Sequence, residues 1–596
     1  MDFRKPKFLF PIVSLALAVY YTFPFLLNLH NWGIRDWDLF TCIAAIPASS
    51  VLDYGQFPFW NPYMGGGNIL FHHPEVGVLT PFFLLYLLFG SVVGLKLQVL
   101  ICYFLGFWGS QKLFNKLGMS LVVSIVSSVA YFGSVHFALH FAEGHIPFTH
   151  YAFLPWFLYF VLRAGRNRIF KRESQVKTSK VSKDGFVEHS HRMLSIFWAG
   201  VMLALMILGN GAAIPLMYTM LFSFMLIGLR SVQNRTIYEF QNLVLATLTG
   251  FGLAAVKMLP MIVYLVQNEW AGNPNESIPL SALTSIFFGL KHSLFAHNFP
   301  EQYWAWHEYG AYLSPFLVVS AVYVLVRCFR ASIIWVILAV FSLLLGLGDF
   351  GFLSPWSLLA KLPGFSSARC TGRAFQFVIL SVAVLGGFGF DWLRHSFEKT
   401  RFRKVSATVL WLAMAVVVCT NLVFAWPILA RAHTWPACDV HRSPVFRNVV
   451  DEESLAYENF LANRGSLITP WLSAYYPSRG MVGPDSVVYS EFVSKGEAEI
   501  IHRKYTPNVI TYEFNGIKPG QMVIGMGYDP GWKASDNRTL YAVDGLITFD
   551  FDKGNQIVVL TYQSPYFYYG LFLSLASLVF LAVIGIKKRK LTMIKT

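Results

Sequence analysis

Two carboxylates, Asp36 and Asp38, follow the first long apolar run of the sequence and lie on either side of Trp37. A carboxylate at a membrane surface can take the proton of an attacking hydroxyl and so act as a general base. The same spacing can hold a divalent metal ion on a sugar-nucleotide diphosphate. Along an extended segment, residues two apart point to the same side, so we expect both carboxylates to face one cavity. We favour Asp38 as the base because Arg35 is nearer to Asp36, and a pair of solvated loop acids is the plain alternative.

Three cationic side chains are candidates for binding an anionic group. Arg369 and Arg373 stand close together in a segment expected on the outer face of the membrane, where basic residues are scarce. A guanidinium group binds phosphate through a two-pronged fork, so a lipid phosphate accounts for both. Lys257 lies inside the apolar run Phe251–Val266, where a charge is costly unless it faces a wet cavity or a counter-charge. All three are therefore candidate phosphate ligands, and for the arginines contact with ordinary lipid head groups is the alternative.

The segment between the first two predicted spans also carries aromatic and imidazole side chains. Trp60 precedes the triple glycine Gly65–Gly67, and its ring suits the apolar face of a sugar as well as a membrane interface. His72, His73 and Glu75 could ligate a metal ion, but adjacent histidines in one loop more often make hydrogen bonds. We therefore assign no metal ligand, and a divalent metal ion stays possible as a cofactor.

Two further polar residues lie in turns between predicted spans. His145 belongs to a turn that joins two spans, and Glu308 lies in a stretch rich in tryptophan and histidine. Together with Trp60, His72 and His73 they complete the candidate set for binding a sugar or an acceptor. A short polar turn between two spans also needs no function.

The composition indicates what must position these residues. The 596 residues are 55% hydrophobic and only 13% charged, with a mean hydropathy of +0.50, which excludes a soluble protein. The apolar residues form runs of roughly 15 to 25, about the length that a helix needs to cross a bilayer. We predict an all-α polytopic membrane protein of about twelve helices, with Val76–Gly90 as a re-entrant or interfacial element. The predicted spans are Phe8–Leu29, Val92–Trp108, Leu121–Phe141, Phe148–Leu162, Leu194–Leu208, Ala213–Leu229, Leu243–Val266, Tyr312–Val326, Ile333–Leu347, Ala374–Phe390, Ala407–Trp426 and Tyr568–Ile586.

The positions of lysine and arginine predict the orientation. Every second loop is basic, including Arg163–Arg192, and cytoplasmic loops accumulate such residues. Both termini are therefore expected in the cytoplasm, and Asp36 and Asp38 on the other side, where nucleotide donors are absent. The net charge of +15 then reflects topology, and a nucleic-acid partner is not expected.

A change of pattern marks a separate domain near the C-terminus. Between residues 427 and 566, polar and apolar residues alternate around turn signals such as Asn515-Gly516 and Asp544-Gly545. This predicts a small β-rich extracytoplasmic domain. The remaining parts are a transmembrane domain over 1–426 with a large first outer loop at 30–90, and a last helix with a basic tail over 567–596.

Several segments together resemble the YfhO family of bacterial membrane proteins. They are FPFWNPYMGGGNILFHHPEVGVLTPFFLLYLLFG, GHIPFTHYAFLPW, GLAAVKMLP, PGFSSARCTGRAFQF and YDPGWKASDN…YAVDGLITF…VVLTYQSP, in the order that the family shows. That family is similar to the GT-C membrane glycosyltransferases. By this resemblance, Asp36 or Asp38 falls where such enzymes carry the acid of the first outer loop, and Arg369 and Arg373 fall in an arginine-bearing loop. Lys257 departs from the pattern, because relatives usually carry a neutral polar residue there.

The resemblance implies a function and a location. It implies a glycosyltransferase of the bacterial cytoplasmic (inner) membrane that takes a sugar from a polyprenyl-phosphate-linked lipid donor. The acceptor would be an extracytoplasmic glycan, lipid or cell-wall polymer. The alternatives are a lipid or polysaccharide transporter and a non-catalytic assembly protein. The sequence does not identify the sugar, the acceptor or the stereochemical outcome.

Overall fold

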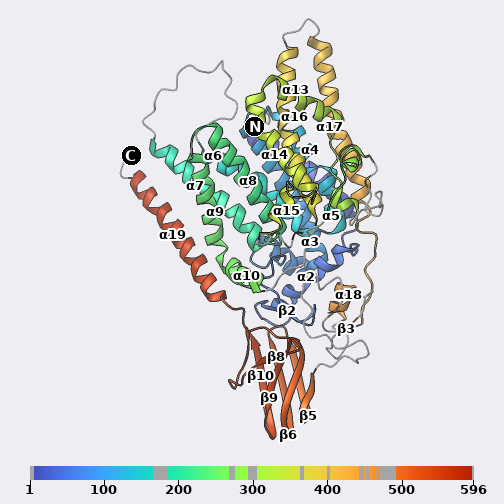
Figure 1. Ribbon diagram of the computed structural model, residues 1–596, viewed down its shortest axis with the longest axis vertical. Helices are drawn as coiled ribbons and strands as arrows, with labels where there is room; N and C mark the ends of the chain where they lie inside the picture. The colour runs from blue at the N-terminus through green and yellow to red at the C-terminus, as the bar shows by residue number, and fades with distance from the viewer. Residues whose placement is uncertain are drawn as a thin grey trace.

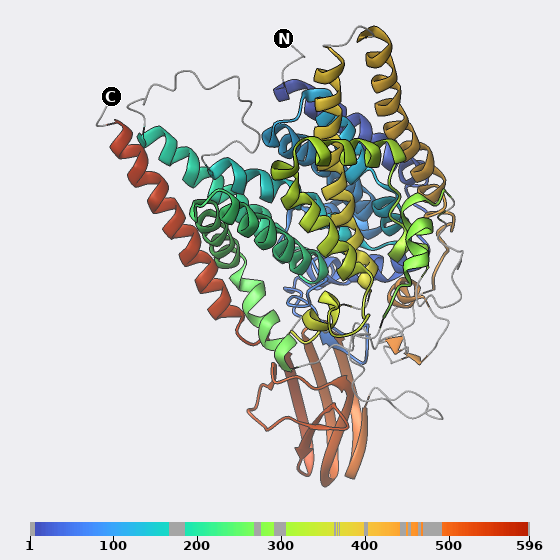
Figure 2. The ribbon, with the colours of Figure 1, turned by 45° about the horizontal axis from the view of Figure 1, so that its top comes forward.

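The computed structural model describes residues 6–165, 185–267, 276–290, 292, 305–362, 365, 368, 370–398, 403–441, 449–450, 455–462, 467–468 and 491–593. A body of helices carries a β-sheet at one end, and α1 begins and α19 ends away from the sheet (Figures 1 and 2). The long helices are α1 (Pro6–Leu27), α2 (Asp36–Leu52), α3 (Pro81–Leu117), α4 (Leu121–Phe132), α5 (Val135–Glu143), α6 (Phe153–Ala164), α7 (Gly185–Leu208), α8 (Ile214–Gln233), α9 (Tyr238–Leu253), α10 (Ala255–Gln267), α13 (Pro315–Arg327), α14 (Phe329–Gly346), α16 (Phe375–Phe397), α17 (Arg403–Leu429) and α19 (Phe567–Met593). The short ones are η1 (Ile146–Ala152), η3 (Leu280–Ala282), α11 (Leu283–Phe288), α12 (Trp306–Tyr309), α15 (Pro355–Leu359), η5 (Thr371–Ala374) and α18 (Ala456–Leu461).

The apolar runs of the sequence form the helices of the body. Among the described residues, seven helices are long and apolar enough to cross a membrane, and nine if each of two bent helix pairs counts as one span. Two shorter apolar helices lie in Pro315–Arg327 and Phe567–Val583. The protein is therefore a multi-pass membrane protein, whereas the predicted count of twelve spans is not confirmed.

Three predicted elements differ from the structure. The predicted span Leu243–Val266 is wrong as a single helix, because α9 and α10 meet at 89°. The predicted span Leu121–Phe141 bends by 42° between α4 and α5, where Gly133 and Ser134 interrupt the helix. The predicted re-entrant element Val76–Gly90 is in part the start of α3, which begins at Pro81 and kinks at Gly90. A proline in the first turn of a helix loses no hydrogen bond, so Pro81 starts α3 rather than breaking it.

Helix α2 is the main surprise in the segment expected as an outer loop. Most of its residues are buried, and it packs against α3 and α18. Figure 1 shows it at the end of the helical body that faces the sheet. The candidate carboxylates therefore lie in the first turn of a helix and not on an extended segment.

The C-terminal domain is an antiparallel sheet, as its alternating pattern predicts. Its strands β5 (Glu491–Thr506), β6 (Val509–Gly527), β7 (Trp532–Ala534), β8 (Tyr541–Val543), β9 (Leu546–Phe551) and β10 (Gly554–Tyr562) follow the order β7-β10-β6-β9-β8, and β5 also pairs with β6. Ile510, Tyr512 and Phe514 alternate into the core of the sheet. Asp544 and Gly545 both have positive φ, which suits the two-residue turn between β8 and β9. The short strands are β1 (Trp60–Asn61), β2 (Asn68–Ile69), β3 (Val449–Val450) and β4 (Leu467–Ile468).

The segment between α2 and α3 holds the sheet against the helical body. Trp60 is 1% exposed, lies 5.3 Å from the Trp532 ring, and directs its Nε1–H at Met526 Sδ, 3.3 Å away. The backbone N–H of Gly527 donates to the carbonyl oxygen of Gly66 over 2.7 Å. The aromatic and glycine-rich segment is thus a structural joint between two domains.

Candidate active site

The two candidate carboxylates point away from each other. Successive residues of an α-helix are about 100° apart, so residues two apart lie on nearly opposite faces. Asp36 faces the end of α5, whereas Asp38 faces α18. The prediction that both face one cavity is therefore wrong, because it assumed an extended backbone.

Asp38 caps a distant helix. Its two carboxylate oxygens accept hydrogen bonds from the backbone N–H groups of Ala456, at 2.6 Å, and Tyr457, at 3.0 Å. Leu455 precedes α18 and its side chain cannot cap the helix, so Asp38 takes that role. Burial raises the pKa of Asp38 to about 6, although both N–H groups act in the opposite direction. These contacts give Asp38 a structural task.

Asp36 pairs with the histidine that follows α5. Its Oδ2 lies 3.2 Å from Nε2 of His145, and its side chain is 28% exposed whereas that of His145 is 9% exposed. Burial works to raise the pKa of Asp36, but the hydrogen bond and charge of His145 outweigh it and hold that pKa below the ordinary value. The same pair raises the pKa of His145 against the effect of its burial. Asp36 is therefore an ionised carboxylate with an accessible edge.

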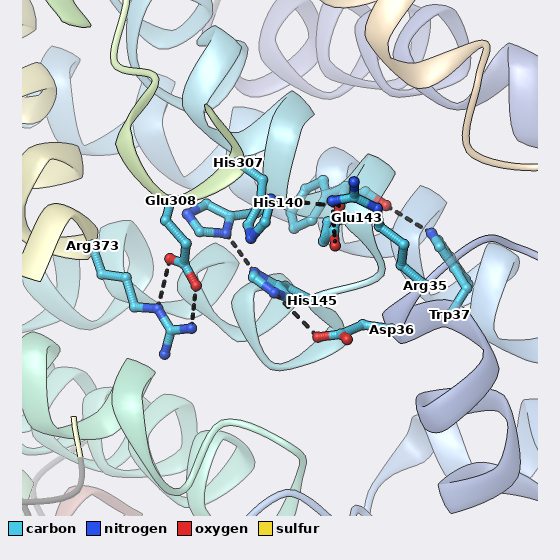
Figure 3. A network of polar contacts seen from close by, with 10 residues as sticks. Arg35, Asp36, Trp37, His140, Glu143, His145, His307, Glu308 and Arg373 are labelled. Carbon is cyan, nitrogen blue, oxygen red and sulfur yellow. Dashed lines mark hydrogen bonds and ion pairs between the residues drawn. The ribbon is translucent and has the colours of Figure 1, made fainter. Parts of the chain in front are cut away.

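A glycine allows this close approach. Gly144 follows α5 with φ +102°, and a Cβ atom there would lie 2.2 Å from the backbone nitrogen of Trp37. On the other side, Trp37 Nε1 donates to the carbonyl oxygen of Phe141 over 3.0 Å. The first turn of α2 is thus fixed against the end of α5, which places Asp36 beside His145 (Figure 3).

Arg35 pairs with Glu143 and not with Asp36. Its Nη1 lies 3.1 Å and 3.0 Å from the two oxygens of Glu143. The reason for preferring Asp38 as the base, that Arg35 occupies Asp36, is therefore wrong. Arg35 has φ 54°, a conformation that costs energy for a residue with a side chain and that clusters at functional sites.

Histidines and a second acid–base pair extend the arrangement. His145 Nδ1 lies 2.7 Å from His140 Nδ1, and His307 Nδ1 lies 3.6 Å from an oxygen of Glu143. Burial lowers the pKa of His307 to about 3, so its imidazole is neutral. We call these residues the acid–histidine cluster, which consists of Arg35, Asp36, His140, Glu143, His145, His307, Glu308 and Arg373.

Arg373 forms a two-pronged ion pair with the buried Glu308, and the Arg373 side chain is 12% exposed. Arg373 Nε donates to Glu308 Oε2 over 2.8 Å, and its Nη2 donates to Oε1. Burial works to raise the pKa of Glu308, but the Arg373 charge outweighs it and keeps that pKa well below the ordinary value. A Cβ atom on Gly372 would lie 2.5 Å from the carbonyl oxygen of Glu308, so a glycine is needed where the two segments meet. Arg369, the other predicted phosphate ligand, lies outside the described residues.

The remaining candidates lie elsewhere. Trp60 is enclosed in the domain joint and offers no face to a sugar. His72 is buried against Ser564, whose hydroxyl lies 2.9 Å from its Nδ1, and burial lowers the pKa of His72 to about 3. His73 is fully buried, and its Nδ1 accepts from the backbone N–H of Glu75 over 3.2 Å.

Lys257 is buried in the first turn of α10. Its Nζ donates to the carbonyl oxygens of Val76, at 2.5 Å, and Gly209, at 2.7 Å. The ammonium group of Lys257 is thus occupied by hydrogen bonds to backbone carbonyl groups, beside the sharp bend between α9 and α10. Among the predicted site residues that the structure describes, Asp36, His145, Glu308 and Arg373 come together in the acid–histidine cluster.

His140, Glu143 and His307 were not among the predicted site residues. His136, His140 and Glu143 recur at spacings of four and three residues, which places them on one face of α5. That periodicity was the available signal, and it was hidden by the apolar residues of a predicted span. His307 directly precedes the predicted candidate Glu308, and its place in that tryptophan- and histidine-rich stretch was the available signal.

The cluster can perform acid–base chemistry next to a cation. An accessible carboxylate, an imidazole in contact with it and a mostly buried guanidinium lie within one network (Figure 3). Fold and site thus define the class: a multi-pass membrane protein with a sheet domain and a buried acid–histidine site.

Comparison with known proteins shows that the structure of this chain is similar to two solved structures. No protein-family model and no curated sequence matches the chain, so the resemblance to the YfhO family stays a prediction. Arabinofuranosyltransferase AftD from mycobacteria is similar at 14% identity and a TM-score of 0.40, over 70% of this chain and 27% of that one. ArnT from Cupriavidus metallidurans, solved bound to undecaprenyl phosphate, is similar at 11% identity and a TM-score of 0.42, over 78% of this chain and 88% of that one. The chain thus spans about a quarter of AftD, and at this level of likeness nothing about substrates carries over.

Proposed function

We propose that the protein is a membrane glycosyltransferase that moves a sugar from a polyprenyl-phosphate-linked donor to an acceptor outside the cytoplasmic membrane. The observation that carries the proposal is Asp36, a carboxylate with a 28% exposed side chain among buried partners. It lies on the first helix after α1, where the sequence resemblance places the acid of the reaction. In the membrane orientation predicted from the positions of lysine and arginine, both termini are cytoplasmic and the sheet is extracytoplasmic.

The proposed reaction is a single displacement at the anomeric carbon of the sugar. The acceptor oxygen forms a bond to that carbon while the bond from carbon to phosphate oxygen breaks. The polyprenyl phosphate leaves with the bonding electrons, and the acceptor proton passes to Asp36. His145, already hydrogen-bonded to Asp36 through Nε2, holds the carboxylate in place.

Arg373 is the proposed partner of the departing phosphate. A guanidinium group has five N–H donors, and Glu308 accepts from two of them while fixing the plane of the group. The charge of Arg373 then stabilises the phosphate most strongly as the negative charge develops on it. Asp38, Trp60, His72 and Lys257 have no part in this scheme, because their contacts lie in other parts of the fold.

Sugar transfer by the full-length protein in liposomes tests the proposal. Radiolabelled polyprenyl-phosphate-linked hexoses and pentoses are supplied one at a time with a cell-envelope extract as acceptor, and loss of label from the donor lipid is measured. Asp36→Asn is expected to slow transfer about a hundredfold to ten-thousandfold, the usual effect of losing a general base. Arg373→Ala is expected to remove about 2 to 5 kcal/mol of the free energy with which the protein stabilises the donor phosphate during transfer.

Asp53→Asn is the matched control, because Asp53 lies just beyond the other end of α2 and is exposed. It should transfer sugar as the parent does. If the parent protein consumes none of the donors, or if Asp36→Asn remains fully active, the proposed chemistry is wrong.

A further inference from the structure

We propose that His140, His145 and Glu308 form a binding site for one divalent transition-metal ion, for which Zn²⁺ is the best fit. One ligand atom from each residue lies within 4.8 Å of the other two, and all three residues are buried. They come from three separate segments: α5, the turn before η1, and α12. The proposal does not depend on the glycosyltransferase activity, because metal binding is measured without a donor or an acceptor.

The hydrogen bonds of His145 prepare one of its nitrogens for a metal. Its Nε2 lies 3.2 Å from Asp36, so the proton on Nε2 is donated to that carboxylate. The other nitrogen, Nδ1, is then a lone-pair donor that points at His140. A carboxylate that fixes the outer nitrogen of a histidine is the usual support of a metal-binding imidazole.

His140 is a buried imidazole that needs a further partner. Its Nδ1 faces the Nδ1 of His145 at 2.7 Å, and among the described residues its Nε2 has no hydrogen-bond partner. The ring stacks on Phe148 with centroids 3.7 Å apart, so it is held in one plane. Two Nδ1 atoms at this distance must share one proton, and a metal ion bound to both takes the place of that proton.

Glu308 supplies an anionic oxygen. A carboxylate has about four lone-pair positions, and the Arg373 fork takes two of them while holding the group still. Two imidazoles and one carboxylate are the ligand set of catalytic zinc sites, which leave a fourth position for water or a substrate oxygen. Mg²⁺ and Ca²⁺ prefer sites made of oxygen atoms, so two imidazole ligands disfavour them.

Metal analysis of the purified full-length protein tests the site. The protein in detergent is treated with a chelator, dialysed against Zn²⁺ and assayed for bound metal by mass spectrometry. We expect one Zn²⁺ per chain and a higher melting temperature with Zn²⁺ than with Mg²⁺ or Ca²⁺. Co²⁺ in place of Zn²⁺ should show the visible d–d absorption of a cobalt ion bound by imidazole and carboxylate ligands.

Variants separate this site from other histidines. His140→Asn and Glu308→Gln should each lower Zn²⁺ affinity at least tenfold. His150→Asn, which alters a buried histidine outside the cluster, and His502→Ala, which alters an exposed one on β5, should leave it unchanged. Circular dichroism and size-exclusion chromatography check that each variant is folded. If His140→Asn does not fold, the Zn²⁺ affinity of Glu308→Gln decides the test.

Three results would overturn the proposal. They are a parent protein that takes up neither Zn²⁺ nor Co²⁺ stoichiometrically, a folded cluster variant that binds Zn²⁺ as the parent does, and equal stabilisation by Mg²⁺. Zinc binding without any sugar transfer would support the metal site and leave the proposed enzyme activity refuted.

Discussion

Replacing Asp38 should loosen α18 and leave the acid–histidine cluster intact. Asp38→Ala removes both acceptors at the start of this six-residue helix, and Leu455 cannot replace them. Two charge-assisted hydrogen bonds are worth about 1.5 to 3 kcal/mol each. Burial of the charge acts against these bonds, because the pKa of Asp38 is raised to about 6 even with both of them present. The net loss should therefore be smaller than their sum, about 1 to 2 kcal/mol, the range measured for helix caps.

Amide hydrogen exchange measures the loss of stability locally, within α18. A loss of about 1 to 2 kcal/mol corresponds to about 5- to 30-fold faster exchange of the amides that Asp38 protects, those of Ala456 and Tyr457. Mass spectrometry of peptides that cover 455–462 measures it in the full-length protein. Asp53→Ala, a control beyond the other end of α2, should leave these amides unchanged.

The pH dependence provides a second check. The folded-state pKa of Asp38 lies above its ordinary value, so its contribution to stability is present in full below about pH 4 and is lost as the pH rises through about 6. Asp38→Asn does not titrate and keeps one acceptor. The parent should therefore gain melting temperature over Asp38→Asn as the pH falls from 7 to 5. Unchanged exchange in Asp38→Ala together with a pH-independent difference would show that Asp38 does not cap α18.

Other predictions concern the cluster and the topology. Gly144→Ala should lower both melting temperature and sugar transfer, because its Cβ atom would lie 2.2 Å from the α2 backbone. Gly118→Ala should cost less, since its φ of +116° is equally strained but nothing lies within 4 Å of a Cβ atom there; equal losses would contradict the proposed steric role. Asp36→Asn should weaken Zn²⁺ binding about tenfold to a hundredfold as a supporting residue, and unchanged affinity would separate Asp36 from the metal site. In a background without exposed native cysteines, an impermeant thiol reagent added to intact cells should label Lys533→Cys in the sheet and spare Asn234→Cys after α8; the opposite pattern would invert the predicted orientation.

The sequence predicted the elements that depend on local pattern. Long apolar runs identified α3 and α16, and alternation identified β6 and β9. The bends between α4 and α5 and between α9 and α10 were missed, because hydropathy reports that a run is apolar and not that its axis is straight. Helix α2 was missed because a segment of 17 residues containing Pro47 lies among polar turns and was counted with the outer loop.

The site depended on contacts between distant parts of the chain. Asp36 and Arg373 were predicted from residue type, but the choice between Asp36 and Asp38 required knowing what each carboxylate faces. The partner of Asp38 is 418 residues away in the sequence, and that of Arg35 is 108 residues away. No local pattern contains this information.

The joint between Trp60 and the sheet has a consequence for biogenesis. Trp60 and Met526 are 466 residues apart, so at about 5 to 20 residues per second the ribosome needs about 20 to 90 s to supply the partner of this ring. During that interval the aromatic segment after α2 is already outside the membrane, in the proposed orientation, without its cover. A nascent chain stalled before residue 509 should therefore be cut by protease in this segment, whereas the finished protein should resist.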